Sequence, residues 1–315
     1  MPNMFSSTII PTVGRDTLAR AVNSVLSQSF DKADFEVIVV NDSGKPLQRQ
    51  DWQSSNRVQV IKTNRRERSI ARNTGAAIAR GKYLHFLDDD DWLFPDALCH
   101  FWQLSQNKQA AWFYGSSELV ERNGSKLIQL HHEIQGNCFL QAMAGEWIPL
   151  QSSLIEAELF HRWGGFSALI TGPEDIDLFR RICLYGEVAG TSNLIASIER
   201  GEAGSTTNYN QHSELSRLAR EQILDDPVAF HRMKQSATSG YWLGRMLRMY
   251  FTSVIWNLQH KRLAIAASRL VSGLAVIVLS HFRISSVSFW KAFLKSYQSP
   301  TFARGFRLSS RKFAK

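Results

Sequence analysis

Apolar runs and amphipathic stretches alternate over the first hundred residues of the chain. The apolar runs, of the kind that form strands, read FSSTII, FEVIVV, RVQVI and KYLHFL. Between the first two, Leu18, Val22 and Val25 recur at helical spacing within residues 16–29. Residues 35–40 are apolar at all but one position, which is typical of a strand in a parallel sheet covered by helices on both faces. The pattern predicts an α/β fold.

The pattern changes after residue 91. A helix is predicted over residues 94–107, and two further strand patterns, AWFYGSSELV and KLIQLHH, flank Asn123-Gly124, a dipeptide typical of hairpin turns. A hairpin adds antiparallel strands, so we expect a mixed sheet. From about residue 136, short helices and loops rich in Gly and Trp precede a helix that begins near Glu174.

The last part of the chain has a helical period. Leu243 and Leu247 recur at helical spacing while Arg245 and Arg248 fall elsewhere, which predicts an amphipathic helix with a basic face. A second helix is predicted over residues 263–282. The longest uncharged stretches in this part have twelve and thirteen residues, against the roughly 20 that a helix needs to span a bilayer. No transmembrane helix is expected.

Charge divides the chain into an acidic body and a basic tail. The formal net charge is +9, but residues 227–315 hold fifteen Lys and Arg and no Asp or Glu, so residues 1–226 carry 22 basic against 28 acidic side chains. Aromatic residues among the basic ones suit either a nucleic acid or an anionic membrane surface. The amphipathic helices favour the membrane surface over nucleic acid. The alternative is a helical unit docked on the rest of the chain.

Cysteine usage and the first residues indicate the compartment. The three cysteines are widely spaced and have no His at metal-ligand spacing, which argues against a disulfide framework and against a zinc site. The start, MPNMFSSTII, lacks the basic and apolar regions of a secretory signal. We expect a reducing, cytoplasmic location.

Four consecutive aspartates, Asp88 to Asp91, directly follow the apolar run KYLHFL. Adjacent carboxylates repel one another and are costly to bury, and a cation at the end of the strand resolves both problems. Oxygen ligands select a hard cation, here Mg or Mn, which would bridge to a diphosphate. The alternative is a solvated acidic turn before the next helix.

Three blocks of the sequence resemble the signature blocks of family 2 nucleotide-sugar glycosyltransferases. They read STIIPTVGRDTLARAVNSVLSQSFDKADFEVIVVNDSG, ARNTGAAIARGKYLHFLDDDDWLFPDAL and WGGFSALITGPEDIDLFRRICLYG, in order between residues 5 and 186. The resemblance implies the GT-A fold, a Rossmann-like, doubly wound mixed sheet, and an inverting single displacement. It implies a glycosyltransferase domain over residues 1–226, with a nucleotide-binding half to about residue 110 and an acceptor-binding half from 111, followed by the basic helical extension 227–315.

The resemblance also implies roles for residues of the nucleotide-binding half. Thr12 and Asp42 match residues that meet the nucleotide base, which agrees with ligand binding beyond the carboxyl ends of strands. The alternative for Asp42 is an Asx-turn at the end of a strand. Asp88 and Asp89 match the nucleotide-binding part of the DxD region, with Asp89 near the ribose. Asp90 matches the direct metal ligand, whereas Asp91 is expected to cap the next helix.

The third block implies the catalytic residue. Asp175 matches the base that takes the proton from the acceptor hydroxyl, with Glu174 and Trp163 in acceptor-binding or supporting roles. Helix-end statistics offer a structural alternative for Glu174 and Asp175. Asp177 is expected to pair with Arg180 or Arg181.

Two further sets of residues are candidates for the donor diphosphate and its metal. Arg72 is a candidate for binding the diphosphate; the other candidates are Arg65, Arg66 and Arg68. Many relatives carry His-x-x-Ser after the ED helix, where this chain has Glu202-Ala203-Gly204-Ser205. Glu202 is therefore a candidate metal ligand, and His212, or neither residue, is the alternative.

Together these features predict a metal-dependent inverting glycosyltransferase. It would move a sugar from a nucleotide-diphosphate sugar, a UDP-sugar being favoured, to a hydroxyl of a glycan or lipid-linked acceptor in cell-surface polysaccharide assembly. The expected location is the cytoplasm, peripheral on the inner face of the cell membrane. The alternatives are a non-catalytic nucleotide-sugar-binding or assembly protein of the same fold, and a Mg-dependent nucleotidyltransferase.

Overall fold

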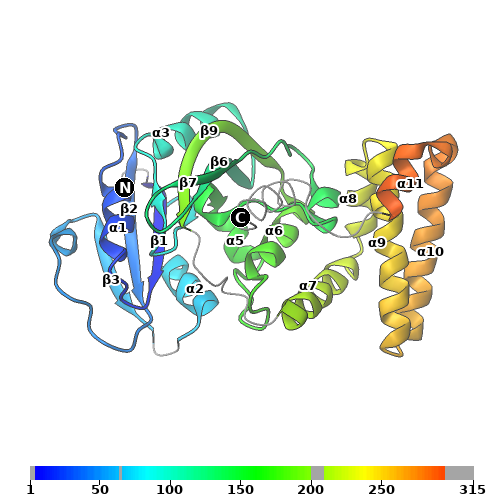
Figure 1. Ribbon diagram of the computed structural model, residues 1–315, viewed down its shortest axis with the longest axis horizontal. Helices are drawn as coiled ribbons and strands as arrows, with labels where there is room; N and C mark the ends of the chain where they lie inside the picture. The colour runs from blue at the N-terminus through cyan, green and yellow to red at the C-terminus, as the bar shows by residue number, and fades with distance from the viewer. Residues whose placement is uncertain (1–3, 64–65, 200–208, 295–315) are drawn as a thin grey trace, which may run out of the picture.

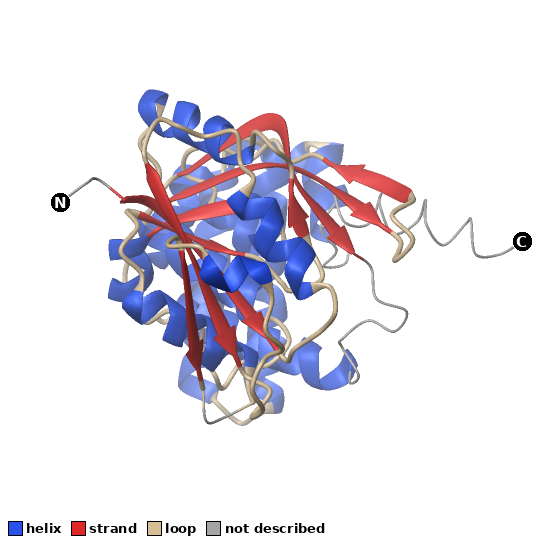
Figure 2. Ribbon diagram, turned by 90° about the vertical axis from the view of Figure 1, so that its left-hand side faces the viewer, coloured by secondary structure: helices blue, strands red, loops and turns tan. Residues whose placement is uncertain are grey.

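The computed structural model describes residues 4–63, 66–199 and 209–294. Within them, a nine-stranded mixed sheet carries helices on both faces (Figure 2). The strands are β1 Met4–Thr12, β2 Asp34–Asn41, β3 Val58–Lys62, β4 Tyr83–Phe86, β5 Trp92–Leu93, β6 Trp112–Val120, β7 Lys126–Leu130, β8 Ser153–Glu156 and β9 Val188–Glu199.

The N-terminal part of the sheet is parallel. β3, β2, β1 and β4 lie in this order, and every neighbouring pair among them runs parallel. Successive residues of β1 face opposite sides, so Ile9 joins the core beneath helix α2 (Arg68–Ile78) and Ile10 the core beneath helix α1 (Leu18–Leu26). β2 is buried from Phe35 to Asn41. The predicted α/β class and the doubly covered strand are confirmed.

The rest of the sheet is mixed. β8 pairs antiparallel with β4 and with β6, β9 runs parallel to β6, and β5 pairs antiparallel with β9. β6 and β7 form the expected hairpin, in which Gly124 takes a positive φ of 83° that only glycine adopts without cost. The helices before residue 240 that follow α2 are α3 Ala97–Asn107, α4 Phe139–Met143, α5 Ala157–Arg162, α6 Glu174–Tyr185, α7 Tyr209–Leu224 and α8 Ala229–Ser236, with short 3₁₀ helices at Asp51–Ser54 and Leu150–Ser152.

The end of the described chain forms a helical unit at one end of the molecule, far from β1–β3 (Figure 1). It comprises α9 Gly240–Gln259 and α10 Leu263–Ser280, which lie side by side, a 3₁₀ turn His281–Ser285, and α11 Val287–Leu294. The Ser239 hydroxyl accepts a hydrogen bond from the Trp242 N–H and so caps the start of α9. The two predicted helices are confirmed. The division at residue 226 stays a prediction, and α8 packs against α4 of the body.

The prediction that α9 has a basic face is wrong. Arg245 is buried and donates to the Ala144 carbonyl, and Arg248 donates to the Phe293 carbonyl. The exposed face carries Phe251, Ile255 and Leu258 instead. Arginine can turn inward where main-chain carbonyls are free to accept, and periodicity alone does not reveal them.

The sequence analysis expected no helix long enough to span a membrane, because its uncharged stretches were short. Helix α10 differs from this expectation. By length and composition alone, its 18 residues, with a mean hydropathy of 2.0, could cross a membrane, and 28% of this segment is buried within the protein. Its single charge, Arg269, is buried and paired with Glu221 and Asp225. Counting uncharged residues therefore split a segment that is continuous in the structure.

Candidate active site

The polar residues that follow β1, β2 and β4 meet at the carboxyl edge of the parallel strands. The Thr12 hydroxyl donates to Asp89 over 2.6 Å. Asp42 lies next to Thr12, because its N–H donates to the Thr12 carbonyl, and its carboxylate accepts from the Thr63 hydroxyl. The structure thus brings together the three strand-end positions that the sequence singled out. Their contacts with a nucleotide base stay a prediction.

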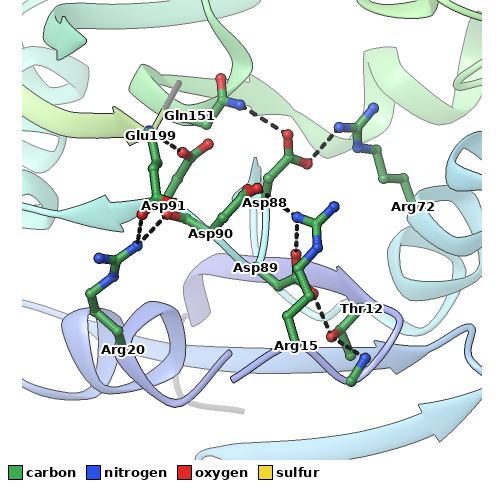
Figure 3. Close-up of polar contacts among 11 residues, drawn as sticks. Thr12, Arg15, Arg20, Arg72, Asp88, Asp89, Asp90, Asp91, Gln151 and Glu199 are labelled. Carbon is green, nitrogen blue, oxygen red and sulfur yellow. Dashed lines mark hydrogen bonds and ion pairs between the residues drawn. The ribbon is translucent and has the colours of Figure 1, made fainter. Parts of the chain in front are cut away.

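The carboxylates of the aspartate tetrad, Asp88 to Asp91, are held by partners from several parts of the chain (Figure 3). Asp88 accepts from Arg72 at 2.7 Å and from Gln151 at 3.1 Å. Asp91 accepts from the backbone N–H of Glu199 at 2.7 Å. We expected Asp91 to cap the next helix. It does not, because α3 begins at Ala97 and strand β5 lies between them. The long-range pairing of β5 with β9, which places Glu199 beside the tetrad, explains the difference.

Arg15 is one of the residues at the candidate site that the sequence analysis missed. One nitrogen of its guanidinium lies 2.9 Å from Asp89 and 2.5 Å from Asp90. The side chain is 51% exposed, so it covers the acidic cluster from the solvent side. The available signal was a basic residue directly after the Gly14 turn that follows β1. A second arginine, Arg20, donates to the main-chain carbonyl of Asp90 and pairs with Glu199.

Burial and crowding set the electrostatics of the tetrad. Burial, together with the neighbouring carboxylates of Asp88 and Asp89, raises the pKa of Asp90 to about 6. Burial also raises the pKa of Asp89 and of Asp91. At Asp88 the effect of burial is overcome by Arg72 and further arginines, which hold its pKa below the usual value. Among the described residues, the side chains of two arginines, Arg15 and Arg72, pair with these four carboxylates.

The tetrad has the donors of a hard-metal site. Carboxylate oxygens of Asp88, Asp90 and Asp91 lie within 4.8 Å of one another. Three oxygen donors with excess negative charge fit Mg or Mn. Asp89 is outside this group and is held by Thr12 and Arg15. Glu202 lies outside the described residues, as does the side chain of His212, so their assignment as ligands stays a prediction.

The ED motif forms the first turn of α6. The Glu174 carboxylate accepts from the Gly172 N–H at 2.8 Å and from Arg72 at 3.1 Å, and Arg68 lies at 3.5 Å. Asp175 is half-buried, and its carboxylate accepts a hydrogen bond from the N–H of Ile176 at 2.7 Å. Burial and the adjacent Glu174 raise the pKa of Asp175 to about 7. A carboxyl group with this pKa can accept a proton near neutral pH.

Arg72 joins the two acidic motifs. Its guanidinium is buried and bridges Asp88 on the tetrad loop and Glu174 on α6. Burial lowers the pKa of Arg72, but these two carboxylates more than offset this and keep it raised. The sequence analysis assigned Arg72 to the diphosphate, and that contact stays a prediction. The sequence analysis did not predict the bridge between Asp88 and Glu174.

The remaining predicted residues are Asp177, in the first turn of α6, and Trp163, which contacts the last residue of that helix. Asp177 pairs with Arg181, one of its two expected partners, at 2.8 Å. Trp163 stacks on Tyr185 with ring centroids 3.9 Å apart. Tyr185 is ten residues beyond Asp175 on the same helix, which is about 15 Å at 1.5 Å per residue. The structure therefore does not bring Trp163 together with Asp175, and its acceptor-binding role stays a prediction.

Residues 7–169 match the sequence model of "Glycosyl transferase family 2", which is more than half of the chain. The chain belongs to glycosyltransferase family 2. The match ends before the ED motif, so the geometry at Glu174 and Asp175 is evidence independent of it. Membership confirms the resemblance drawn from the three sequence blocks.

Curated relatives within the family match parts of the chain. The poly(ribitol-phosphate) beta-N-acetylglucosaminyltransferase TarP of Staphylococcus aureus (strain N315) is 35% identical over 98 residues, which cover 29% of this chain and 30% of TarP. The GalNAc(5)-diNAcBac-PP-undecaprenol beta-1,3-glucosyltransferase of Campylobacter jejuni is 29% identical over 177 residues, which cover 51% of this chain and 55% of that enzyme. The chain thus spans from under a third to just over half of the length of these relatives.

A solved structure has the same fold. S. aureus TarS 1–349 in complex with UDP-GlcNAc superposes with a TM-score of 0.61 and 16% sequence identity, covering 90% of this chain and 93% of that one. At this identity the likeness shows the fold alone. The predicted GT-A type of mixed sheet is confirmed.

Proposed function

We propose that this family 2 chain is a metal-dependent inverting glycosyltransferase. It transfers a sugar from a nucleotide-diphosphate sugar to a hydroxyl group of a glycan or lipid-linked acceptor. The observation that carries the proposal is Asp175, a half-buried carboxyl group with a pKa raised to about 7 at the start of α6. It is linked through Glu174 and Arg72 to the acidic loop at the sheet edge.

The proposed roles follow from the chemistry of the side chains. Asp88, Asp90 and Asp91 would hold Mg or Mn, which neutralises the charge of the donor diphosphate when bound. Thr12 and Asp42 line the strand ends where the nucleoside would lie. Asp175 accepts the proton of the attacking hydroxyl, and a single positioned carboxylate suffices for an inverting displacement. A uridine nucleotide is favoured because the similar TarS fragment was solved with UDP and with UDP-GlcNAc.

The acceptor class and the location belong to the same proposal. The names of two relatives point to poly(ribitol-phosphate) and to an undecaprenol-linked glycan, which supports cell-surface polysaccharide assembly. The basic charge of residues 227–315 supports a peripheral position on the cytoplasmic face of the cell membrane. A non-catalytic nucleotide-sugar-binding protein and a nucleotidyltransferase remain the alternatives.

Replacing Asp175 by Asn tests the catalytic assignment. The readouts are UDP release from a panel of UDP-sugars with Mn, and UDP affinity by calorimetry. We expect turnover to fall about 100-fold or more while UDP affinity changes by less than about twofold, because a general base acts on the chemical step. The control is Glu158→Gln, which removes an exposed carboxylate on α5.

Two results would contradict the proposal. Unchanged turnover in Asp175→Asn would remove the base assignment. UDP and Mn binding without turnover of any UDP-sugar in the wild-type protein would favour the non-catalytic alternative.

A further inference from the structure

Exposed large apolar side chains are concentrated on the C-terminal helical unit. Of the 18 found among the described residues, 12 lie between residues 251 and 294. Six of them belong to α10, with exposed fractions from 39% to 72%: Leu263, Leu270, Val271, Leu274, Ile277 and Val278. A contiguous apolar surface of this kind marks an interaction site in a folded protein.

The outer face of α10 is apolar, and three of the five residues that it buries are small. Ala266, Gly273 and Ser280, spaced by seven residues, are buried against the protein, and a Cβ added at Gly273 would lie 3.5 Å from Tyr250 of α9. The opposite face is apolar from Leu263 to Val278, about 22 Å at 1.5 Å per residue. A surface helix of a soluble protein normally has the reverse arrangement, with its polar face outward.

Arg269 fixes this orientation. Its buried guanidinium lies 2.5 Å from Asp225 and 3.5 Å from Glu221, and it donates to the Leu224 carbonyl at 3.1 Å. Rotating α10 to hide its apolar face would take Arg269 away from these partners. A crossing of the bilayer by α10 alone would break the same contacts. The apolar face is therefore held outward, and a partner must come to it.

Basic side chains border the apolar face at both ends. Lys261 and Arg262 lie at the turn between α9 and α10, Arg283 lies in the turn before α11, and Lys291 lies on α11; all four are exposed. Trp290, 44% exposed on α11, is a side chain suited to the boundary between headgroups and acyl chains. A second copy of the chain would present the same positive charges to this surface, whereas an anionic bilayer complements them.

We propose that the outer face of α9, α10 and α11 is a membrane-docking surface. Its apolar side chains enter the boundary between the headgroups and acyl chains of an anionic bilayer, and α10 lies in the plane of the membrane. The rim of Lys261, Arg262, Arg283 and Lys291 contacts the anionic headgroups. This deepens the membrane location in the proposed function, but it rests on surface composition and does not depend on glycosyl transfer.

The proposal distinguishes apolar insertion from purely electrostatic attraction. Salt screens contacts between exposed charges but does not weaken apolar insertion. With vesicles of phosphatidylcholine containing about 30% phosphatidylglycerol, partitioning of the full chain should fall by less than about tenfold between about 0.1 M and about 0.5 M salt. Loss of all binding at the higher salt would overturn the insertion.

A matched pair of double variants tests the surface in a vesicle sedimentation assay. Leu270→Glu with Leu274→Glu should lower partitioning by about tenfold or more at both salt concentrations, because it places two charges on the inserted face. The control, Ile78→Glu with Val228→Glu, replaces two exposed apolar residues outside α9, α10 and α11 and should partition like the wild type. Calorimetry of UDP with Mn, measured for every variant, separates loss of docking from loss of the nucleotide site.

A label reports insertion without disturbing the charge. In a Cys99→Ser background, Val278→Cys carrying an environment-sensitive fluorophore should shift to the blue when vesicles are added. An unshifted label, or equal partitioning of the two double variants, would overturn the proposal. A stable dimer in sedimentation equilibrium that Leu270→Glu with Leu274→Glu dissociates would show instead that a second copy covers this face.

Discussion

Replacing Arg72 by Met tests whether the bridge between the acidic loop and α6 holds the two halves of the candidate site together. Met keeps much of the volume of the side chain but removes its charge and its donors. In the native structure, the guanidinium lies 2.7 Å from Asp88 and 3.1 Å from Glu174, and its side chain is only 4% exposed. The change leaves both carboxylates without their shared partner.

The expected cost follows from the burial of this network. Removing one partner of a buried ion pair costs about 3–5 kcal/mol. Gln151 still donates to Asp88 and the Gly172 N–H to Glu174, so we expect the lower end, about 3 kcal/mol. At about 2–4 °C per kcal/mol for domains of 150–250 residues, the melting temperature should fall by roughly 6–12 °C, and by less for a longer chain.

Thermal and urea unfolding in the presence of a chelator measure this change without a contribution from metal binding. The matched control is Arg162→Met, which breaks an exposed i,i+4 pair with Glu158 and should cost about 0.5 kcal/mol or less. A double-mutant cycle with Asp88→Asn isolates the coupling between Arg72 and Asp88.

If Arg72→Met melts within the range of Arg162→Met, the bridge does not stabilise the fold. Arg72 would then be free to serve the diphosphate as the sequence analysis predicted, and UDP affinity with Mn should fall in the variant.

Two further predictions concern the chemistry of the site. Asp90→Asn should abolish the dependence of UDP binding on Mn, because it removes a central oxygen donor of the cluster, and equal UDP affinity with and without chelator in the wild type would contradict the metal assignment. Turnover should rise with pH through about 7, the pKa of Asp175, because only the ionised carboxylate accepts a proton. Turnover that stays constant from about 1.5 pH units below that pKa to about 1.5 units above it would show that another group limits the reaction.

Local pattern determined much of the fold and part of the site. An all-apolar run such as residues 35–40 can be buried on both faces only inside a covered parallel sheet, and Asn123-Gly124 specifies a tight hairpin. The four consecutive aspartates after β4 predicted an acidic cluster at the end of that strand. These signals are short in range, because they depend on side-chain periodicity and on turn chemistry.

Tertiary structure decided which residues share the site and which way the helices face. Arg15, Gln151 and Glu199 contact aspartates of the tetrad that lie 63 to 108 residues away in sequence, and only the closing of the mixed sheet brings them together. By helical period, Arg245 was expected on an exposed basic face, and Arg269 is the single charge of the apolar helix α10. Both point inward, because the Ala144 carbonyl accepts from Arg245, and Glu221 and Asp225 pair with Arg269. The apolar side of α10 therefore faces outward. Periodicity identifies the faces of a helix, but the partners available in three dimensions select the face that is buried.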